Sequence, residues 1–251
     1  MDIRQLLGLK QLEEVKSIVC VQPHPDDNEV GAGGTLAKLA EKGCRIVFVT
    51  VTDGRFGTTD PTVAPDDLVE TRRQERERAG KLLGVSKQIE LGFSDGGYYT
   101  EREVMEALIP IFREEKPELV MTVDPWMPYE AHPDHYKVGR AVAAAVLAAD
   151  TIGFPEAGAP YAVPQVGFYA TSYPNTFIDV SAYWDKKIEA ILAHDSQFNT
   201  PDWPLLSQFF AYQASELFRV MKNNDGTDGY AEAFKVLATL QLHFFPAAIY
   251  S

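Results

Sequence analysis

The sequence predicts an α/β fold built on a mostly parallel sheet, and two observations support this prediction. Between residues 15 and 149, short apolar runs rich in β-branched residues alternate with longer segments of helical spacing. A strand, a helix and a second strand in this order form a right-handed unit with parallel strands. Two of the apolar runs are also followed by acidic histidine motifs. Sheets of this kind bind ligands beyond the carboxyl ends of their strands, which is where both motifs would lie.

The alternating segments are assigned from their length and residue types. The apolar runs are too short for helices, whereas the segments between them place apolar residues three or four positions apart. Gly43 and Gly84 follow two of these segments and suit the left-handed position that ends a helix. The expected strands are residues 15–21, 45–53, 88–91 and 119–123, and the expected helices are residues 29–42, 70–83, 102–115 and 134–149.

The last third of the chain alternates less regularly. Residues 153–164 are rich in Gly and Pro, and we expect a loop there that borders the half of the molecule holding the site. The expected strands are residues 166–170 and 177–180, and the expected helices are residues 183–194, 205–221 and 230–240. We therefore expect extra C-terminal strands and helices within one domain that spans residues 1–251.

Composition narrows the class of partner and the compartment. The net charge of -13 and the pI near 4.8 argue against nucleic acid or an anionic membrane, which both require clustered Lys and Arg. No run reaches the ~18 apolar residues of a membrane span, and the first residues lack a signal-peptide core, so we expect a cytoplasmic protein. Cys20 and Cys44 lie in or beside apolar strands, which predicts buried reduced thiols rather than a disulfide framework.

The two motifs form a candidate metal site. His24-Pro25-Asp26-Asp27 follows the first strand, and His132-Pro133-Asp134-His135 follows the strand at residues 119–123. His24, Asp27 and His135 would supply two imidazoles and one carboxylate and leave coordination positions open for water and substrate. Open sites of this kind are catalytic rather than structural. Zinc is the first choice of metal and ferrous iron the second, because the same ligands serve both.

The remaining side chains of the motifs have roles in hydrolysis. Asp26 is the spare carboxylate and would take a proton from a water that the metal acidifies. His132 lies three residues before His135, so both rings can face one cavity, with His132 as oxyanion stabiliser or general acid. Asp134 either orients an imidazole or caps the following helix.

Two rival classes of function remain open. Gly31-Ala32-Gly33-Gly34 after the first strand and Asp53 after the second resemble a dinucleotide fingerprint, which would indicate a nicotinamide-binding oxidoreductase. The acidic groups of residues 24–29 disfavour that class, because they would lie against the pyrophosphate. A metal-binding protein without activity is the other rival.

The motifs resemble those of the LmbE/PIG-L family of zinc-dependent N-deacetylases. The resemblance implies a Rossmann-like three-layer α/β sandwich, a zinc ion, and removal of acetate from N-acetylglucosamine (GlcNAc) or diacetylchitobiose. The alternative substrates are GlcNAc conjugates with malate or inositol. Further stretches resemble the diacetylchitobiose deacetylase branch: Thr52-Asp53-Gly54, Gly57-Thr58-Thr59-Asp60, Asp124-Pro125-Trp126, Pro128-Tyr129-Glu130, His194 with Ser196-Gln197-Phe198, and Tyr230-x-Glu232-x-Phe234.

The resemblance also assigns site residues. It makes His24, Asp27 and His135 the zinc ligands, and it makes Asp26 the general base and His132 the group that stabilises the oxyanion.

Arg72, Asp95, Tyr129 and His243 are expected to contact the substrate. Arg72, in an R-x-x-E pair with Glu75, would face the pocket, although a helical salt bridge is the alternative. Asp95 would bind sugar hydroxyls or form a turn. Tyr129 lies three residues before His132, whereas some relatives carry a tyrosine two before.

The C-terminal tail resembles one that completes an active site across a subunit contact. This predicts that His243 binds substrate in a homo-oligomer, a trimer or hexamer, and the alternative is a buried histidine in an aromatic cluster. His194 is expected to anchor a helix end.

Overall fold

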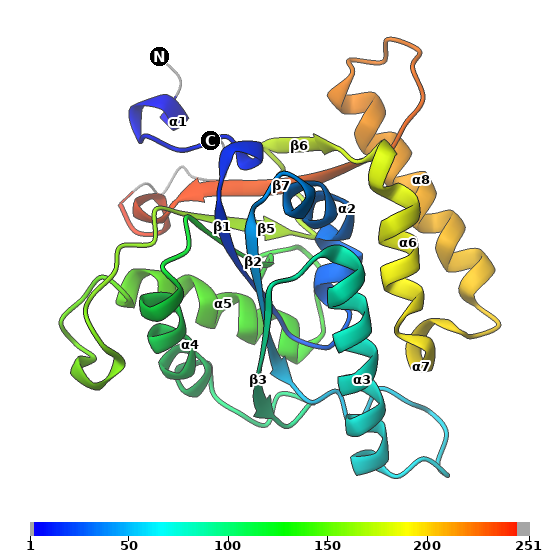
Figure 1. The fold of residues 1–251 in the computed structure, drawn as a ribbon, viewed down its shortest axis with the longest axis horizontal. Coiled ribbons are helices and arrows are strands. Elements are labelled where there is room, and N and C mark those ends of the chain that lie inside the picture. The colour runs from blue at the N-terminus through cyan, green and yellow to red at the C-terminus, as the bar shows by residue number, and fades with distance from the viewer. Residues whose placement is uncertain (1–2, 245–251) are drawn as a thin grey trace.

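The computed structural model describes residues 3–244, and one mixed sheet lies at its centre (Figure 1). The strand order is β3-β2-β1-β4-β5-β7-β6, and β1 to β5 are mutually parallel, whereas β7 runs antiparallel to both of its neighbours. The strands are β1 Ser17–Gln22, β2 Arg45–Thr52, β3 Lys87–Phe93, β4 Leu119–Val123, β5 Gln165–Tyr169, β6 Thr176–Asp179 and β7 Ala231–Ala238.

Helices cover both faces of the sheet. Ile18 and Cys20 of β1 belong to a core cluster with α2 and α6, whereas Val19 and Val21 point the other way, into a cluster with α4 and α5. Alternate residues of β1, β2 and β4 therefore pack into two cores on opposite faces of the sheet, which makes three layers. The helices are α1 Ile3–Leu6, α2 Asp27–Glu41, α3 Pro65–Leu83, α4 Glu101–Glu115, α5 Pro133–Ala148, α6 Trp184–Leu192, α7 Asp195–Phe198 and α8 Trp203–Met221.

The predicted α/β sandwich with a mostly parallel sheet is confirmed, and most expected elements occur within a few residues of their predicted limits. Helix α3 begins earlier than expected because Pro65 suits the first position of a helix, where no amide donor is needed. Both cysteines are buried and free, as predicted. Among the described residues, no helix combines the length and the apolar character that crossing a bilayer requires.

The predicted helix at residues 230–240 is wrong, because residues 231–238 form β7. Ala, Glu, Lys and Leu favour a helix in isolation. In the folded chain this segment pairs with β5 on one side and β6 on the other, and Phe234 is fully buried. Glu232, also buried, accepts hydrogen bonds from the amides of Gly34 and Thr35 and from Lys187. Tertiary pairing therefore overrides local propensity here.

The expected position of the loop at residues 153–164 is also wrong. This loop joins the end of α5 to the start of β5, so it lies at the amino edge of the parallel strands, away from the two histidine motifs. Arg113 of α4 holds it there by donating to the carbonyls of Phe154 and Gly158, and to Thr151 just before it.

Candidate metal centre and active site

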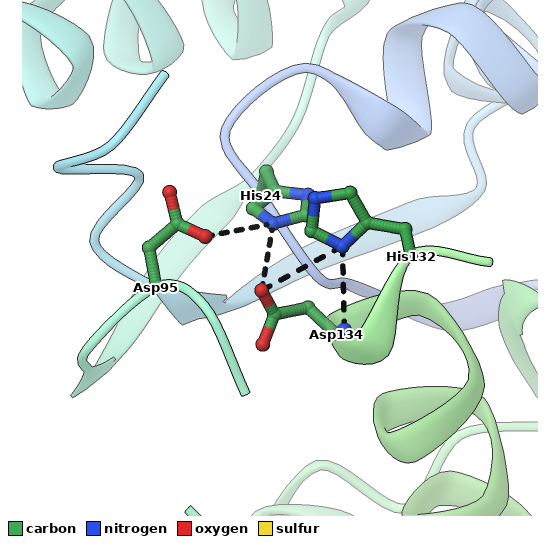
Figure 2. A group of neighbouring side chains, drawn as sticks. All are labelled: His24, Asp95, His132 and Asp134. Atoms are coloured by element: carbon green, nitrogen blue, oxygen red, sulfur yellow. Dashed lines mark hydrogen bonds and ion pairs between the residues drawn. The ribbon is translucent and has the colours of Figure 1, made fainter. Parts of the chain in front are cut away.

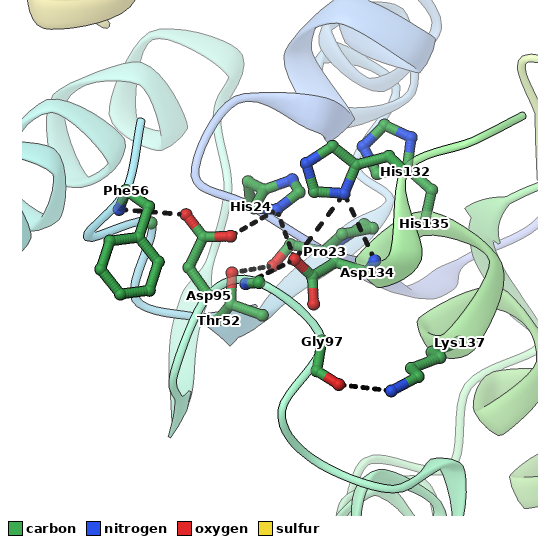
Figure 3. Close-up of polar contacts among 12 residues, drawn as sticks. Pro23, His24, Thr52, Phe56, Asp95, Gly97, His132, Asp134, His135 and Lys137 are labelled. Atoms are coloured by element: carbon green, nitrogen blue, oxygen red, sulfur yellow. Dashed lines mark hydrogen bonds and ion pairs between the residues drawn. The ribbon is translucent and has the colours of Figure 1, made fainter. Parts of the chain in front are cut away.

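The two histidine motifs meet at the carboxyl edge of the sheet because β1 and β4 are adjacent strands. The ring centroids of His24 and His132 are 4.6 Å apart, and those of His132 and His135 are 4.9 Å apart. Figure 3 shows the three imidazoles grouped between the loop after β1 and the start of α5. Sheet order therefore brings together side chains that are about a hundred residues apart in the chain.

His24, Asp27 and His135 place one donor atom each within 4.8 Å of one another. Asp27 lies between the rings, with Oδ2 3.2 Å from His24 Nδ1 and Oδ1 3.4 Å from His135 Nε2. Burial acts to raise the pKa of Asp27, but the contacts with His135 and His24 outweigh it and lower the pKa. An ionised carboxylate between two imidazoles is a donor set that suits a divalent transition metal.

A carboxylate lies behind each of the two imidazoles. Asp134 Oδ2 is 3.2 Å from His24 Nε2, and Glu130 Oε2 is 2.9 Å from His135 Nδ1. Asp134 is fully buried and also accepts from Tyr99 Oη and the Gly96 amide. Carboxylates in this position fix the orientation of metal-binding histidines. Of the two predictions for Asp134, orientation of an imidazole is therefore confirmed and the helix cap is wrong, because His132 is the N-cap of α5.

Glu130 was missed by the sequence analysis as a functional residue. The available signal was its place five residues before His135, within the stretch Pro128-Tyr129-Glu130. A spacing of five residues across an irregular loop does not determine where the side chain points.

A second group of possible donors shares His24. His24, Asp95, His132 and Asp134 also have donor atoms within 4.8 Å of one another, and Figure 2 shows Asp95 and Asp134 converging on the Nε2 side of His24. A neutral imidazole offers one lone pair and one N–H, so His24 can serve only one of the two groups. The group of His24, Asp27 and His135 is the better fit. It uses His24 Nδ1 and leaves the proton on Nε2, where Asp134 and Asp95 can accept it at 3.2 and 3.3 Å.

The surroundings of His24 favour positive charge. Burial acts to lower the pKa of His24, yet the contacts with Asp134, Asp27 and Asp95 outweigh it and raise the pKa well above 6.5. Four aspartates, including Asp26, converge on this small region. A bound cation would offset their mutual repulsion, and the residues therefore fit a metal ion.

Asp26 lies beside the donor set and is held under strain. It is the N-cap of α2 with φ 146°, a conformation that non-glycine residues rarely adopt. Its Oδ2 accepts from Arg72 Nη2 at 3.0 Å, and Arg72 also donates to the carbonyls of Pro25 and Gly54. Burial raises the pKa of Asp26 to about 6 although Arg72 opposes the shift. Arg72 thus holds the carboxylate in place.

The alternative interpretation of Arg72 as half of a helical salt bridge with Glu75 is wrong. The Glu75 carboxylate instead accepts from the amide and the hydroxyl of Ser196, both at 2.7 Å.

His132 has a defined tautomer when neutral. Its Nδ1 accepts a hydrogen bond from the Asp134 amide at 3.3 Å, so the proton is on Nε2. Burial and the neighbouring His24 and His135 lower the pKa of His132, which favours this neutral form. His132 can therefore donate a hydrogen bond from Nε2.

A cavity of about 350 Å³ opens over these groups. It is lined by His24, Asp26, Arg72, Asp95 and His132 from the predicted set, and also by Phe56, Gly57, Gly96, Pro133 and Gln197. A larger hollow of about 560 Å³ lies against α8 and contains none of the predicted site residues, so its size does not make it the reaction site. Phe56 was not named from the sequence, because a loop position gives no periodic signal. Gln197, which lies in α7, was quoted only within the stretch Ser196-Gln197-Phe198, without a role at the site.

Two predicted substrate contacts lie away from the cavity in this chain. The Tyr129 side chain is fully exposed, and its φ of 69° belongs to a turn between β4 and α5. His243 follows β7 at the opposite edge of the sheet, beyond the pairing of Ala238 with Gln165. His243 is exposed, so the buried aromatic cluster is wrong, and any contact with the site would require a second copy of the chain.

His194 is the N-cap of α7, and its ring is fully buried 3.6 Å from Glu29. It therefore lies at a helix end, as predicted.

Comparisons with known proteins agree with this arrangement. The sequence profile of PIG-L, described as GlcNAc-PI de-N-acetylase, matches residues 19–146, which include both histidine motifs. The chain is 35% identical over 240 residues to diacetylchitobiose deacetylase of Thermococcus kodakarensis, covering 94% of this chain and 88% of the relative. It is 33% identical to the 1D-myo-inositol 2-acetamido-2-deoxy-alpha-D-glucopyranoside deacetylase of Kineococcus radiotolerans, over 65% of this chain and 53% of that protein.

A solved structure has the same fold over nearly the whole chain. The N,N'-diacetylchitobiose deacetylase from Pyrococcus horikoshii, complexed with an inhibitor, superposes with a TM-score of 0.89 and 32% identity. The match covers 97% of this chain and 92% of that one. The likeness therefore includes the C-terminal strands and helices as well as the parallel core.

Proposed function

Because this chain belongs to the PIG-L family of de-N-acetylases, we propose that it hydrolyses the acetamide of a GlcNAc-containing saccharide to acetate and a free amine. Diacetylchitobiose and GlcNAc are the proposed substrates, in line with the two deacetylases that match it over most of its length. The second candidate is a GlcNAc conjugate with inositol or malate, favoured by relatives that are named as a deacetylase of the inositol conjugate and a probable deacetylase of the malate conjugate. One domain, residues 1–251, would carry the activity.

The observation that carries the proposal is the pair of oriented histidines around Asp27, with Asp26 beside them. His24, Asp27 and His135 would hold Zn²⁺, with Fe²⁺ as the second choice, because neutral imidazole and carboxylate serve both. A metal bound there supplies Lewis acidity and makes water a stronger acid.

The other side chains would move and hold the proton. Asp26 acts as general base through its carboxylate, which lines the cavity and whose Oδ2 is held by Arg72. His132 donates from Nε2 to the oxygen that becomes negatively charged as the amide is attacked. Asp26 then returns the proton to the departing nitrogen.

Some proposed substrate contacts lie within one chain, and others require a second copy of it. Asp95 and Arg72 line the cavity and would bind hydroxyls of the reacting sugar. Tyr129 and His243 would reach substrate only in an assembly, and we place His243 at a neighbouring copy's site in a trimer or hexamer. Light scattering tests the assembly, and a fully active monomer would contradict it.

The function is tested by measuring acetate release with zinc supplied. The panel contains GlcNAc, diacetylchitobiose, GlcNAc-malate and GlcNAc-inositol. Fastest turnover of diacetylchitobiose supports the first candidate, and fastest turnover of a conjugate supports the second. Zinc-loaded protein that releases acetate from none of them contradicts the proposal, and an NAD titration then tests the oxidoreductase alternative.

A further inference from the structure

Phe56 presents an exposed aromatic ring at the mouth of the cavity. Phe56 lies on the loop between β2 and α3 and lines the cavity with Asp95. Its side chain is 54% exposed. Figure 3 shows the Phe56 amide directed at Asp95 while the ring extends away from the buried histidines. Aromatic side chains are common in the lining of ligand pockets, so a ring at the mouth of a polar cavity is a candidate ligand contact.

The backbone around this ring is held from three sides. The Gly54 carbonyl accepts from Arg72 Nη1 at 3.0 Å, and the Phe56 amide donates to Asp95 Oδ2 at 3.2 Å. The Gly57 carbonyl accepts from Gln197 Nε2 at 3.0 Å. All three side chains line the same cavity. The loop is therefore fixed by the site itself, and the exposed position of the ring is built into that arrangement.

A second exposed ring lies beside the first. Tyr98 is 82% exposed, and a Cβ placed on Gly96 would be 3.1 Å from Tyr98 Cε2 and 3.6 Å from Phe56 Cδ2. The two rings therefore flank Gly96, whose amide donates to Asp134 behind His24. Gly96 has φ +97° and lines the cavity, so the aromatic pair borders the reaction site directly.

We propose that Phe56, assisted by Tyr98, stacks against the second sugar ring of a disaccharide substrate and so favours it over the monosaccharide. This proposal rests on the proposed function. A pyranose ring is polar at its edge but presents C–H groups on its faces, which pack on the face of an aromatic ring. The polar inner cavity, with Asp26, Asp95 and His132, suits the reacting sugar. Phe56 and Tyr98 form an apolar rim at the mouth of this cavity, where the second sugar ring would lie.

The test compares Phe56→Ala with wild type on diacetylchitobiose and on GlcNAc. KM for the disaccharide should rise about five- to tenfold, the size of a lost aromatic contact, while kcat stays within about twofold. Kinetics on GlcNAc should change less than about twofold. Phe56→Tyr should restore the disaccharide KM, and Tyr98→Ala should raise it less than Phe56→Ala. Phe209→Ala on α8 is the matched control, because Phe209 is 51% exposed and outside the cavity.

Equal losses on both sugars would overturn the proposal, because they indicate that Phe56 only supports the loop. Unchanged kinetics on both would also overturn it. If wild type releases acetate from neither sugar, the proposed function fails separately. The stacking proposal is then decided by calorimetric titration of diacetylchitobiose: weaker binding by Phe56→Ala supports it, and equal or absent binding overturns it.

Discussion

Asp134→Asn tests whether the carboxylate behind His24 determines metal affinity. Asp134 is fully buried and accepts three hydrogen bonds, from His24 Nε2 at 3.2 Å, Gly96 N at 2.9 Å and Tyr99 Oη at 2.6 Å. Asparagine keeps the shape and can still accept at one oxygen, with its amide group turned to the Tyr99 oxygen. The main loss is the negative charge that stabilises the His24 N–H.

Loss of such a carboxylate typically lowers metal affinity 10- to 100-fold, or about 1.4 to 2.8 kcal/mol. We expect zinc affinity in this range below wild type, measured by competition with a chromophoric chelator. Asp134→Ala should in addition destabilise the fold by about 2–6 kcal/mol, because the Tyr99 hydroxyl and Gly96 amide lose their acceptor at roughly 1–3 kcal/mol each.

The matched control is Asp179→Asn, which removes the same charge at the end of β6, where Asp179 accepts from the Ser181 amide. Its zinc affinity should equal that of wild type, whereas Glu130→Gln should lower affinity as Asp134→Asn does. The reasoning is refuted if Asp134→Asn binds zinc normally. If Asp95→Asn shows the loss instead, Asp95 is the carboxylate that orients His24.

Three further outcomes are expected. Asp26→Asn should retain metal in elemental analysis but release acetate about a hundredfold more slowly, and unchanged turnover would remove Asp26 as the base. Phe234→Ala should destabilise the protein by about 3–5 kcal/mol in urea unfolding, and a loss below 1 kcal/mol would contradict the packing assigned to β7. Burial acts to raise the pKa of Glu115, but contacts with Lys87 and Arg45 outweigh it and hold the pKa below 4.5. A carboxylate with a lowered pKa stabilises the fold above its unfolded pKa and loses that effect as pH falls through the folded value. Wild type should therefore exceed Glu115→Gln in unfolding free energy at neutral pH, with the gap closing in acid, and a gap that does not depend on pH would contradict this.

The local sequence pattern was sufficient to predict the strands of the parallel half of the sheet. Residues 119–123 are apolar without alternation, as expected for a strand covered by helices on both faces, and β4 has those limits. The same reasoning failed at residues 231–238. The residue types there favour a helix, and the partners that make them a strand, β5 and β6, lie far away in the chain.

The sequence likewise predicted only part of the candidate site. The two His-Pro-Asp motifs were recognisable because histidine and aspartate at strand ends are unusual outside binding sites. The exposed Tyr129 and the distant His243 show that a motif identifies a residue type without fixing the direction of its side chain. A turn with positive φ and the end of an antiparallel strand determined those directions.

The sequence by itself determined the chemistry of this protein: which donors are present, that they follow strands, and that the strands belong to a parallel α/β sheet. Only the tertiary structure decided which groups support those donors, namely Asp134 and Glu130 behind the imidazoles, Arg72 on Asp26, and Phe56 at the rim. The physical reason is that donor identity and strand periodicity are local properties of the chain. Contacts between distant side chains depend on strand order and loop conformation, which are set by packing of the whole molecule.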